Sequence, residues 1–528
     1  MTDAGAPARL KLSELLSVLS FGADLGMGQP MEHVLRQCLI SLDLAARLEL
    51  SSDDQQAVFF GSLMVWVGCH IDAYEQAKWF GDDTVLKSDF RHVDFRTTTS
   101  APLFMLRHLG SGLSWHHKVG LIPGFLGDGK KAAESILENH WRAADDLMVQ
   151  LGLDQPVRDT VEQSFERWDG RGAPKGLKGD EIRVTGRLVN LADVVEVFHR
   201  AGGIDAAVTV ATERAGTQFD PDLVDLFTGC ADDVFSRLDD VEPWREVLRA
   251  EPASRYWLTG ASLDAALEAT ADFCDVKSPF TIGHSRGVAD LVSGAAAGYG
   301  LDAADATTAR RAALLHDLGN LGVPNTIWDK PSALSPAERE RARLHVYLTE
   351  RMLTWSPSLA PLGAVAVQHH ERMDGSGYPG RLAGSEIAPA ARLLAAADHY
   401  HALMEPRPHR LAISSEQAAP AVRAEVRAGR LDADATEAVL AAAGHRQAKR
   451  REWPGGLTTR EVEILRLLAR GMSNTDIAKT LTISRKTAGT HVEHIYTKLG
   501  VSNRALASLY AAKHGLIATH VEDPLDAG

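Results

Sequence analysis

The chain of 528 residues has few cysteines and no long apolar run. Its four cysteines, Cys38, Cys69, Cys230 and Cys274, are far apart and form no CxxC pair, which argues against a disulfide framework or a zinc knuckle. We expect buried thiols. No apolar stretch reaches the roughly 18 residues of a spanning helix, and the N-terminus lacks the order of a signal peptide. These absences predict a soluble, cytoplasmic protein that does not bind membranes.

Positive charge is also scarce over most of the chain. The 56 Lys and Arg against 70 Asp and Glu leave a net charge of −14, which excludes a generally basic coat protein or membrane-surface binder. From 446 to 520, however, 13 Lys and Arg face 5 Asp and Glu, a net charge of +8 against −22 elsewhere. This end of the chain could therefore face a polyanion.

The chain does contain an internal repeat. The segment ERWDGRGAPK (166–175) matches ERMDGSGYPG (371–380) at six of ten positions, at an offset of 205 residues. That offset, and one of 251 residues further upstream, pair other ligand-type residues: His140 with His345, Asp193 with Asp398, and His33 with His284. The change in offset places an insertion around 79–131 in the first copy.

Apolar residues recur at spacings of three and four, and no βαβ alternation is present, which predicts an all-α fold. In the second copy the expected helices are 263–274, 286–297, 306–316 and 336–353. Ser335 before Pro336 is a typical N-cap followed by proline at the first helical position. We expect three domains: two related helical units at 10–245 and 255–443, and a small C-terminal domain at 454–518.

The second unit is rich in side chains that can bind metals. A single helical His is more often an ordinary core residue, but seven ligand-type residues in one unit favour a metal centre. Imidazoles and carboxylates together suit Fe, Mn or Zn, and a carboxylate can bridge two ions. Two ions about 3.5–4 Å apart would polarise a phosphoryl oxygen and activate a bridging water, which predicts phosphoester hydrolysis. The seven residues are His284, His316, Asp317, His345, His369, His370 and Asp398.

These residues lie in HDLGNLGVPNTIW, LHVYLTERML, HHERMDGSGYPG and ADHYHAL, which together resemble the HD-GYP branch of the HD phosphohydrolase superfamily. The resemblance implies an all-α phosphodiesterase for cyclic di-GMP with two divalent transition-metal ions, Fe or Mn in preference to Zn. It implies that all seven residues are ligands, that Asp317 bridges the ions, and that His316 and Asp317 are catalytic. The substrate would lie beside Asn320 and the loop of Gly377, Tyr378 and Pro379.

Three positions depart from the family pattern. Asn320 stands where the family has Lys near the substrate phosphate, so we expect slow turnover or an altered substrate because a charge that stabilises the reaction is missing. Phe280 occupies the place of a Glu in members with three metals, which favours two ions. His401 replaces a usual Asp.

The first unit loses the ligand pairs. The repeat aligns His316 and Asp317 with Val65 and Trp66, and the His369 and His370 pair with Ser164 and Phe165. The surviving His33, His140 and Asp193 cannot hold a bridged pair of ions. We therefore expect a non-catalytic unit with a structural, dimerising or ligand-sensing role, in a chain that forms a homodimer.

The basic C-terminal segment predicts four short helices. Thr458 and Glu461 form a capping box, and glycines close the first and third helices. These two glycines are Gly471 and Gly500. The other helix boundaries are expected at Ser473, Ser484, Ser502 and Gly515. This spacing is typical of a helix-turn-helix domain.

The same segment resembles the LuxR/NarL type of DNA-binding domain, which implies a recognition helix at 485–499 in the major groove. The family often has Lys where Gly489 and Glu493 stand here, so the base contacts left are Thr490, His494 and Glu493 to cytosine. The basic run at 446–451 is a solvated linker or adds phosphate contacts. The DNA-binding residues expected are Arg485, Lys486, Thr487, Thr490, His491, His494 and Lys498.

The leading interpretation is a DNA-binding transcriptional regulator that carries a metal-dependent cyclic di-GMP phosphodiesterase domain. A second interpretation keeps the nucleotide site only as a sensor, in a transcription factor without enzymatic activity. A third keeps hydrolysis but assigns another nucleotide or phosphoester as substrate. Asn320 favours the second and third, whereas the complete ligand set and the loop 377–379 favour the first.

Overall fold

The computed structural model describes residues 9–71, 73–80, 140–252, 256–445 and 453–516, apart from 470, 482, 502 and 515, and adds Thr84, 87–88 and 107–109. The insertion expected around 79–131 and the basic run at 446–451 lie almost entirely outside these residues. The described residues are overwhelmingly helical, which confirms the all-α fold. None of the helices described is both long enough and apolar enough to cross a membrane.

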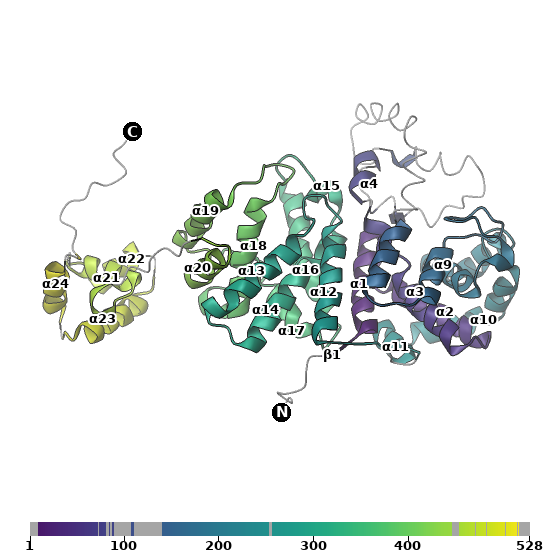
Figure 1. The fold of residues 1–528 in the computed structure, drawn as a ribbon, viewed down its shortest axis with the longest axis horizontal. Coiled ribbons are helices and arrows are strands. Elements are labelled where there is room, and N and C mark those ends of the chain that lie inside the picture. The colour runs from purple at the N-terminus through teal and green to yellow at the C-terminus, as the bar shows by residue number, and fades with distance from the viewer. Residues whose placement is uncertain are drawn as a thin grey trace. The chain divides into compact units, whose positions relative to one another are not determined.

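The first HD-type unit begins with a short strand and continues as helices (Figure 1). α9 breaks at Gly202 and Gly203, whose backbone angles are not helical. The elements are β1 (Arg9–Lys11), α1 (Leu12–Gly26), α2 (His33–Arg47), α3 (Ser52–Met64), η1 (Val67–His70), α4 (Ala73–Phe80), a helical run at 140–150, α8 (Gln155–Gln163), η2 (Gly179–Glu181), α9 (Val184–Arg214), α10 (Pro221–Asp239) and α11 (Pro243–Ala250).

The second unit contains the four predicted helices, each slightly longer than the apolar pattern indicated. Ser335 caps α16 as predicted, because its hydroxyl accepts from the Glu338 backbone N–H. The elements are β2 (Trp257–Thr259), α12 (Gly260–Asp275), α13 (His284–Tyr299), α14 (Ala303–Leu315), η3 (Leu318–Gly322), α15 (Asn325–Trp328), α16 (Pro336–Thr354), α17 (Ala360–Ala366), η4 (Gly384–Glu386), α18 (Pro389–Met404), α19 (Ser415–Arg427) and α20 (Ala433–Ala442).

The two units are parts of one compact body that spans 1–445. β1 pairs antiparallel with β2, with Leu10 opposite Leu258, and one continuous hydrophobic core contains residues of both units. α1 lies against η3 and α16 of the second unit. The domain limits 10–245 and 255–443 remain a prediction, since the pairing and the shared core join the two units.

The structure repeats the same close contacts in both units. A Cβ on Gly68 would lie 2.2 Å from the carbonyl oxygen of His140, and one on Gly319 would lie 1.9 Å from that of His345. Each contact packs the helix bearing the His directly on the turn of its own unit. The offsets of 205 and 251 residues therefore join equivalent positions of two similar folds.

The residues from 446 onward form a second compact unit with its own core around Ile464, Ile477 and Ile495. Ser473 and Ser484 cap their helices as predicted, and Gly500 closes the third with a positive φ of 64°. Asn503 caps the fourth helix through the Leu506 N–H, while Ser502 and Gly515 lie outside the described residues. The elements are η5 (Pro454–Gly456), α21 (Thr459–Ala469), α22 (Asn474–Thr480), α23 (Arg485–Leu499) and α24 (Arg504–Lys513).

The cysteines follow the expectation of buried thiols in three cases. Cys38, Cys230 and Cys274 are buried, whereas Cys69 is half-buried and departs from it.

Candidate metal centre and DNA-binding surface

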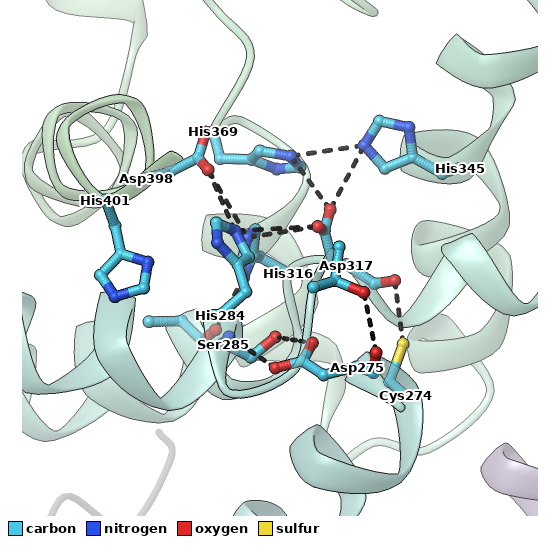
Figure 2. A network of polar contacts seen from close by, with 12 residues as sticks. Cys274, Asp275, His284, Ser285, His316, Asp317, His345, His369, Asp398 and His401 are labelled. Atoms are coloured by element: carbon cyan, nitrogen blue, oxygen red, sulfur yellow. Dashed lines mark hydrogen bonds and ion pairs between the residues drawn. The ribbon is translucent and has the colours of Figure 1, made fainter. Parts of the chain in front are cut away.

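Five helices and the turns beside them bring the predicted ligands together (Figure 2). His284 opens α13, His316 and Asp317 lie in the turn between α14 and η3, and His345 lies in α16. His369 and His370 follow α17, and α18 supplies Asp398. The structure thus gathers seven residues that are spread over more than a hundred positions of sequence.

Asp317 occupies the middle of this cluster, and its two carboxylate oxygens face different imidazoles. Oδ1 lies 3.5 Å from Nε2 of His345 and 3.7 Å from Nε2 of His369. Oδ2 lies 3.7 Å from Nε2 of His316 and 4.0 Å from Nε2 of His284. Such a carboxylate has the orientation that bridging two ions requires.

The donor atoms lie on two sides of Asp317, and the two sides meet where His316, Asp317 and His369 come within 4.8 Å of one another. On the Oδ2 side, Asp398 Oδ1 lies 3.3 Å from His284 Nε2 and 4.0 Å from His316 Nε2. On the Oδ1 side, donor atoms of His345, His369 and His370 lie within 4.8 Å of one another. Each side therefore offers three donors in addition to its oxygen of Asp317.

Backbone carbonyls orient three of the imidazoles. The Nδ1 atoms of His316, His345 and His369 each lie 2.7 Å from the carbonyl oxygen three residues earlier in the chain. A ring that donates from Nδ1 keeps the lone pair of Nε2 available to a metal. Within the described part of the chain, the buried Nε2 of His316 has no hydrogen-bond partner. An orphaned, inward-facing imidazole nitrogen fits a metal ligand.

Burial sets the protonation state of these groups. It lowers the pKa of His345 and His370 and lowers that of His369 to about 3, so these rings are neutral, as metal ligands must be. Burial alone would raise the pKa of Asp317, but the surrounding histidines hold it well below its usual value. On the Oδ1 side, the cluster therefore combines neutral imidazoles with an ionised carboxylate.

His284 is positioned by Glu405, a residue that the sequence pattern did not single out. Burial opposes protonation, but hydrogen bonds to Asp398 and Glu405 raise the pKa of His284 to about 10. Glu405 accepts from His284 Nδ1 at 3.0 Å and lies 3.1 Å from Nδ1 of His401. Glu405 also accepts from Arg407, and its hydrogen bond holds the ring of His284 in place. Together with His284 and His401, Glu405 forms a further group of side chains that could hold an ion.

Two further residues hold the backbone of the turn that carries Asp317. The Cys274 thiol donates to the Asp317 carbonyl at 3.2 Å. The buried Lys277 ammonium donates to the carbonyls of Asn320, Leu321 and Val323 at 2.6–2.9 Å. A single Lys among apolar residues gives no periodic signal, so the sequence could not indicate this role.

The predicted substrate loop lies against the histidines. The ring of Tyr378 lies 4.8 Å from that of His370, and Pro379 follows it. Buried Glu371 holds the loop by accepting the N–H groups of Gly380 and Leu382. Gly377 has no room for a side chain, since its Cβ would lie 2.5 Å from the Cα of Glu371. Asn320 is half-buried in η3.

The first unit fills the equivalent space with aromatic rings. Trp66 donates from Nε1 to Asp193 at 2.8 Å, and its ring lies edge-on to Phe165 at 5.3 Å. The ring of His140 lies 4.9 Å from Phe165, and its Nε2 lies 3.1 Å from the carbonyl of Val65. His33 contacts Asp193 and Glu196. The aromatic contacts and hydrogen bonds thus engage His33, His140 and Asp193, the ligand-type residues that the first unit retains.

The surface expected to bind DNA is α23. Arg485, Lys486, Thr487, Thr490 and His494 are exposed on this helix, and His491 is half-buried. A helix of 15 residues has the right size to enter the major groove.

Lys498 differs from the other residues predicted to bind DNA. Its ammonium donates to Glu461 at 2.8 Å, and Glu461 also accepts from Thr458 in the predicted capping box. This ion pair ties α23 to α21. The DNA contact expected of Lys498 stays a prediction, and a packing role is now the alternative.

These features define a metal-dependent phosphohydrolase of the HD type joined to a helix-turn-helix domain. The HD domain family matches residues 127–223 and 268–435, so both copies of the repeat are recognised, and the bacterial regulatory proteins of the luxR family match 456–511. The chain belongs to the HD domain family and carries a LuxR-type DNA-binding domain at its C-terminal end.

Known relatives agree with this assignment. A 3'3'-cGAMP-specific phosphodiesterase 3 of Vibrio cholerae is 32% identical over 77% of this chain and 89% of its own length. A cyclic di-GMP phosphodiesterase of Thermotoga maritima is 38% identical over 24% of this chain and 35% of its own. A crystal structure of a cyclic GMP-AMP-specific phosphodiesterase of V. cholerae matches 83% of this chain and 99% of its own, with a TM-score of 0.58 and 29% identity.

Proposed function

We propose that this chain hydrolyses a 3'3'-cyclic dinucleotide in its second unit and binds DNA through its C-terminal domain. The observation that carries the first part is the position of Asp317 between two sets of donor atoms in a buried cluster. The long match to a cGAMP-specific relative and the shorter match to a cyclic di-GMP phosphodiesterase support this substrate class. Cyclic di-GMP, predicted from the sequence, and 3'3'-cGAMP are the two substrates to compare.

His284, His316 and Asp398 would hold one ion, and His345, His369 and His370 would hold a second, with Asp317 as a ligand between them. The mixed imidazole and carboxylate donors suit Fe or Mn. When bound, the pair would supply Lewis-acid activation of a phosphoryl oxygen and of the attacking water.

The protein's own residues prepare this chemistry. The Cys274 thiol donates to the backbone carbonyl of Asp317 and helps to hold the turn that carries it. Glu405 keeps Nε2 of His284 directed at Asp398. The Tyr378 ring packs against that of His370, which holds the proposed substrate loop beside the histidines.

A turnover assay tests the enzymatic proposal. The full chain, loaded with Mn or Fe, is incubated with cyclic di-GMP, 3'3'-cGAMP and a linear dinucleotide, and products are separated chromatographically. We expect one cyclic dinucleotide to be cleaved, and Asp317→Asn to remove the activity. Absence of cleavage of both cyclic dinucleotides by the metal-loaded wild type contradicts the proposal.

The sensor interpretation is the second candidate, and Asn320 favours it. Lys277, the buried cation beside this turn, donates to backbone carbonyls. Because position 320 is Asn and not Lys, the turn offers no positive charge to a phosphate. If hydrolysis is only impaired, Asn320→Lys should raise kcat/KM about tenfold. Tight binding of a cyclic dinucleotide without turnover in either protein supports the sensor interpretation.

DNA binding is proposed for the exposed face of α23, with the chain as a homodimer in the cytoplasm. Retention of operator fragments across a salt series should fall steeply with salt, because phosphate contacts dominate affinity. Lys486→Ala should weaken binding, whereas Lys498→Ala should mainly lower the melting temperature because Lys498 pairs with Glu461. Equal retention by wild type and Lys486→Ala at every salt concentration would overturn the assignment of this face.

A further inference from the structure

An arginine of α16 lies beside the proposed substrate loop. Arg343 precedes the ligand-type His345 by two residues, and its guanidinium carbon lies 5.0 Å from the ring centroid of Tyr378. The same ring lies 4.8 Å from that of His370 and 6.5 Å from that of His345. The ring of Tyr378 thus lies between the positive charge of Arg343 and the histidines.

Two other cations near the cluster are already engaged. Lys277 donates to three carbonyls of η3. Arg372 donates from one nitrogen to the carbonyls of His369 and Glu371, so its charge supports the backbone of the loop.

Arg343, in contrast, is held by a weak partner. Its side chain is 43% exposed and pairs at 2.8 Å with Glu340, whose side chain is 70% exposed. An ion pair between exposed side chains three residues apart on a helix contributes little, and a phosphate can replace it. The guanidinium is planar and can donate two parallel hydrogen bonds to one phosphate group, and its contact with Tyr378 limits its orientations in advance.

We propose that Arg343 is a substrate-binding residue that holds the phosphodiester of the cyclic dinucleotide which is not being cleaved. This inference rests on the proposed function and assigns a residue to it. A cyclic dinucleotide has two phosphodiesters, and the metal cluster takes only one at a time. The second then lies towards the rim of the site, where Tyr378 and Arg343 stand. Arg343 would supply binding charge that Asn320 does not.

Steady-state kinetics of the metal-loaded full chain test this role. Arg343→Gln, Arg343→Lys and wild type are compared on the cyclic dinucleotide and on bis(p-nitrophenyl) phosphate, which has a single phosphodiester. Arg351→Gln is the matched control, because Arg351 is exposed on the same helix and lies 6.0 Å from the ring of Tyr347.

We expect Arg343→Gln to raise KM for the cyclic dinucleotide about tenfold with little change in kcat. The ratio of kcat/KM between the cyclic dinucleotide and bis(p-nitrophenyl) phosphate should fall by a similar factor. Arg343→Lys should recover part of the loss, since it keeps the charge without the planar donor pair. Arg351→Gln should resemble wild type.

Two results would overturn the inference while the proposed function stands: an unchanged KM in Arg343→Gln, or an equal loss on both substrates, which would mean a structural role. A wild type that cleaves bis(p-nitrophenyl) phosphate but neither cleaves nor binds a cyclic dinucleotide refutes the proposed function itself, and with it this inference. Calorimetric titration of the cyclic dinucleotide and metal analysis of each variant separate these cases.

Discussion

The two HD-type units show how one fold keeps or loses a metal centre. In the second unit, Asp317 lies between four imidazoles, and their inward nitrogens face its oxygens. In the first, Trp66 occupies the position of Asp317, and its indole donates to Asp193. The backbone contacts that define the fold are the same in both. Both units therefore keep the close contacts of Gly68 and Gly319 and a buried Glu, which is Glu166 in the first unit and Glu371 in the second. Only the side chains inside the fold decide the chemistry.

The supporting charges differ as well. Glu196 and Arg200 of α9 align with His401 of α18 and with Glu405, the residue directly after α18. In the first unit Glu196 accepts from Arg36 and Arg200 and contacts His33. In the second unit the residue aligned with Arg36 is Gly287, and a Cβ there would lie 2.0 Å from Nε2 of His401. The carboxylate thus lies one helical turn later in the second unit, and Gly287 leaves room for the ring of His401.

The turn proposed to bind substrate in the second unit has a counterpart with the same backbone support in the first. Glu166 accepts the N–H groups of Lys175, Gly176 and Leu177, as Glu371 does for Gly380 and Leu382. Because both units keep this Glu, Glu371 supports the fold, whereas Tyr378 is replaced by Ala173 in the first unit, as expected of a residue proposed to serve the site.

The largest expected effect separates the two aspartates. Asp317→Ala should reduce bound metal from about two ions towards none and lower activity on the order of a thousandfold, because the bridging carboxylate offsets the repulsion of two cations. Asp193→Ala in the first unit should leave both unchanged and affect stability only. Metal analysis by mass spectrometry and turnover assays measure this. Comparable metal loss in the two variants would show that the first unit binds metal.

The next largest effect is expected from removing one of the aromatic rings that pack inside the first unit. Trp66→Ala removes a ring that contacts Phe165 and His140 and leaves Asp193 without its indole donor. We expect a loss of about 3 kcal/mol in the free energy of unfolding. Urea denaturation of the full chain tests this, with Trp257→Ala, a 40% exposed tryptophan, as control. An equal, small effect in both would mean that the rings do not stabilise the unit.

Sequence reasoning reached the helices, the repeat and the ligand-type residues because these follow from local periodicity and spacing. Ser335 and Ser484 are clear cap signals, and both act as caps. The pairing of β1 with β2 and the core shared by the units join segments about 250 residues apart, and no local pattern encodes them. Lys277, Glu405 and Arg343 could not be found either, since each is an ordinary charged residue until the fold supplies its neighbours.

The pH dependence of the first unit is a smaller effect. Burial disfavours the charge of Glu196, but His33 and Arg200 lower its pKa from 4.5 to about 2. A depressed folded-state pKa stabilises the protein above the unfolded value, and this contribution is lost as the pH falls from about 4.5 towards 2. Glu196→Gln should flatten the stability profile in this window, measured by urea denaturation at several pH values. The exposed variant Asp240→Asn should keep the wild-type slope; identical slopes in all three proteins would contradict the role of Glu196.

The smallest expected effect tests whether the first unit stabilises the turn of the second unit that carries Asp317. A Cβ on Gly22 of α1 would lie 2.5 Å from Cδ1 of Leu321 and 3.0 Å from Cε of Met352, and both side chains are fully buried. Because Leu321 belongs to η3, directly after Asp317, Gly22→Ala should cost about 1 kcal/mol in stability and shift this turn. We expect a severalfold lower kcat with unchanged metal content.

The control for Gly22→Ala is Gly229→Ala on α10, where a Cβ has no neighbour within 4 Å among the described residues. That change should be neutral or slightly stabilising, because alanine favours the helix over glycine. A destabilised Gly22→Ala with full activity would reduce the first unit to a scaffold. A matched loss of kcat and stability, absent in Gly229→Ala, would show that the unit without a metal centre still sets the geometry of the one that has it.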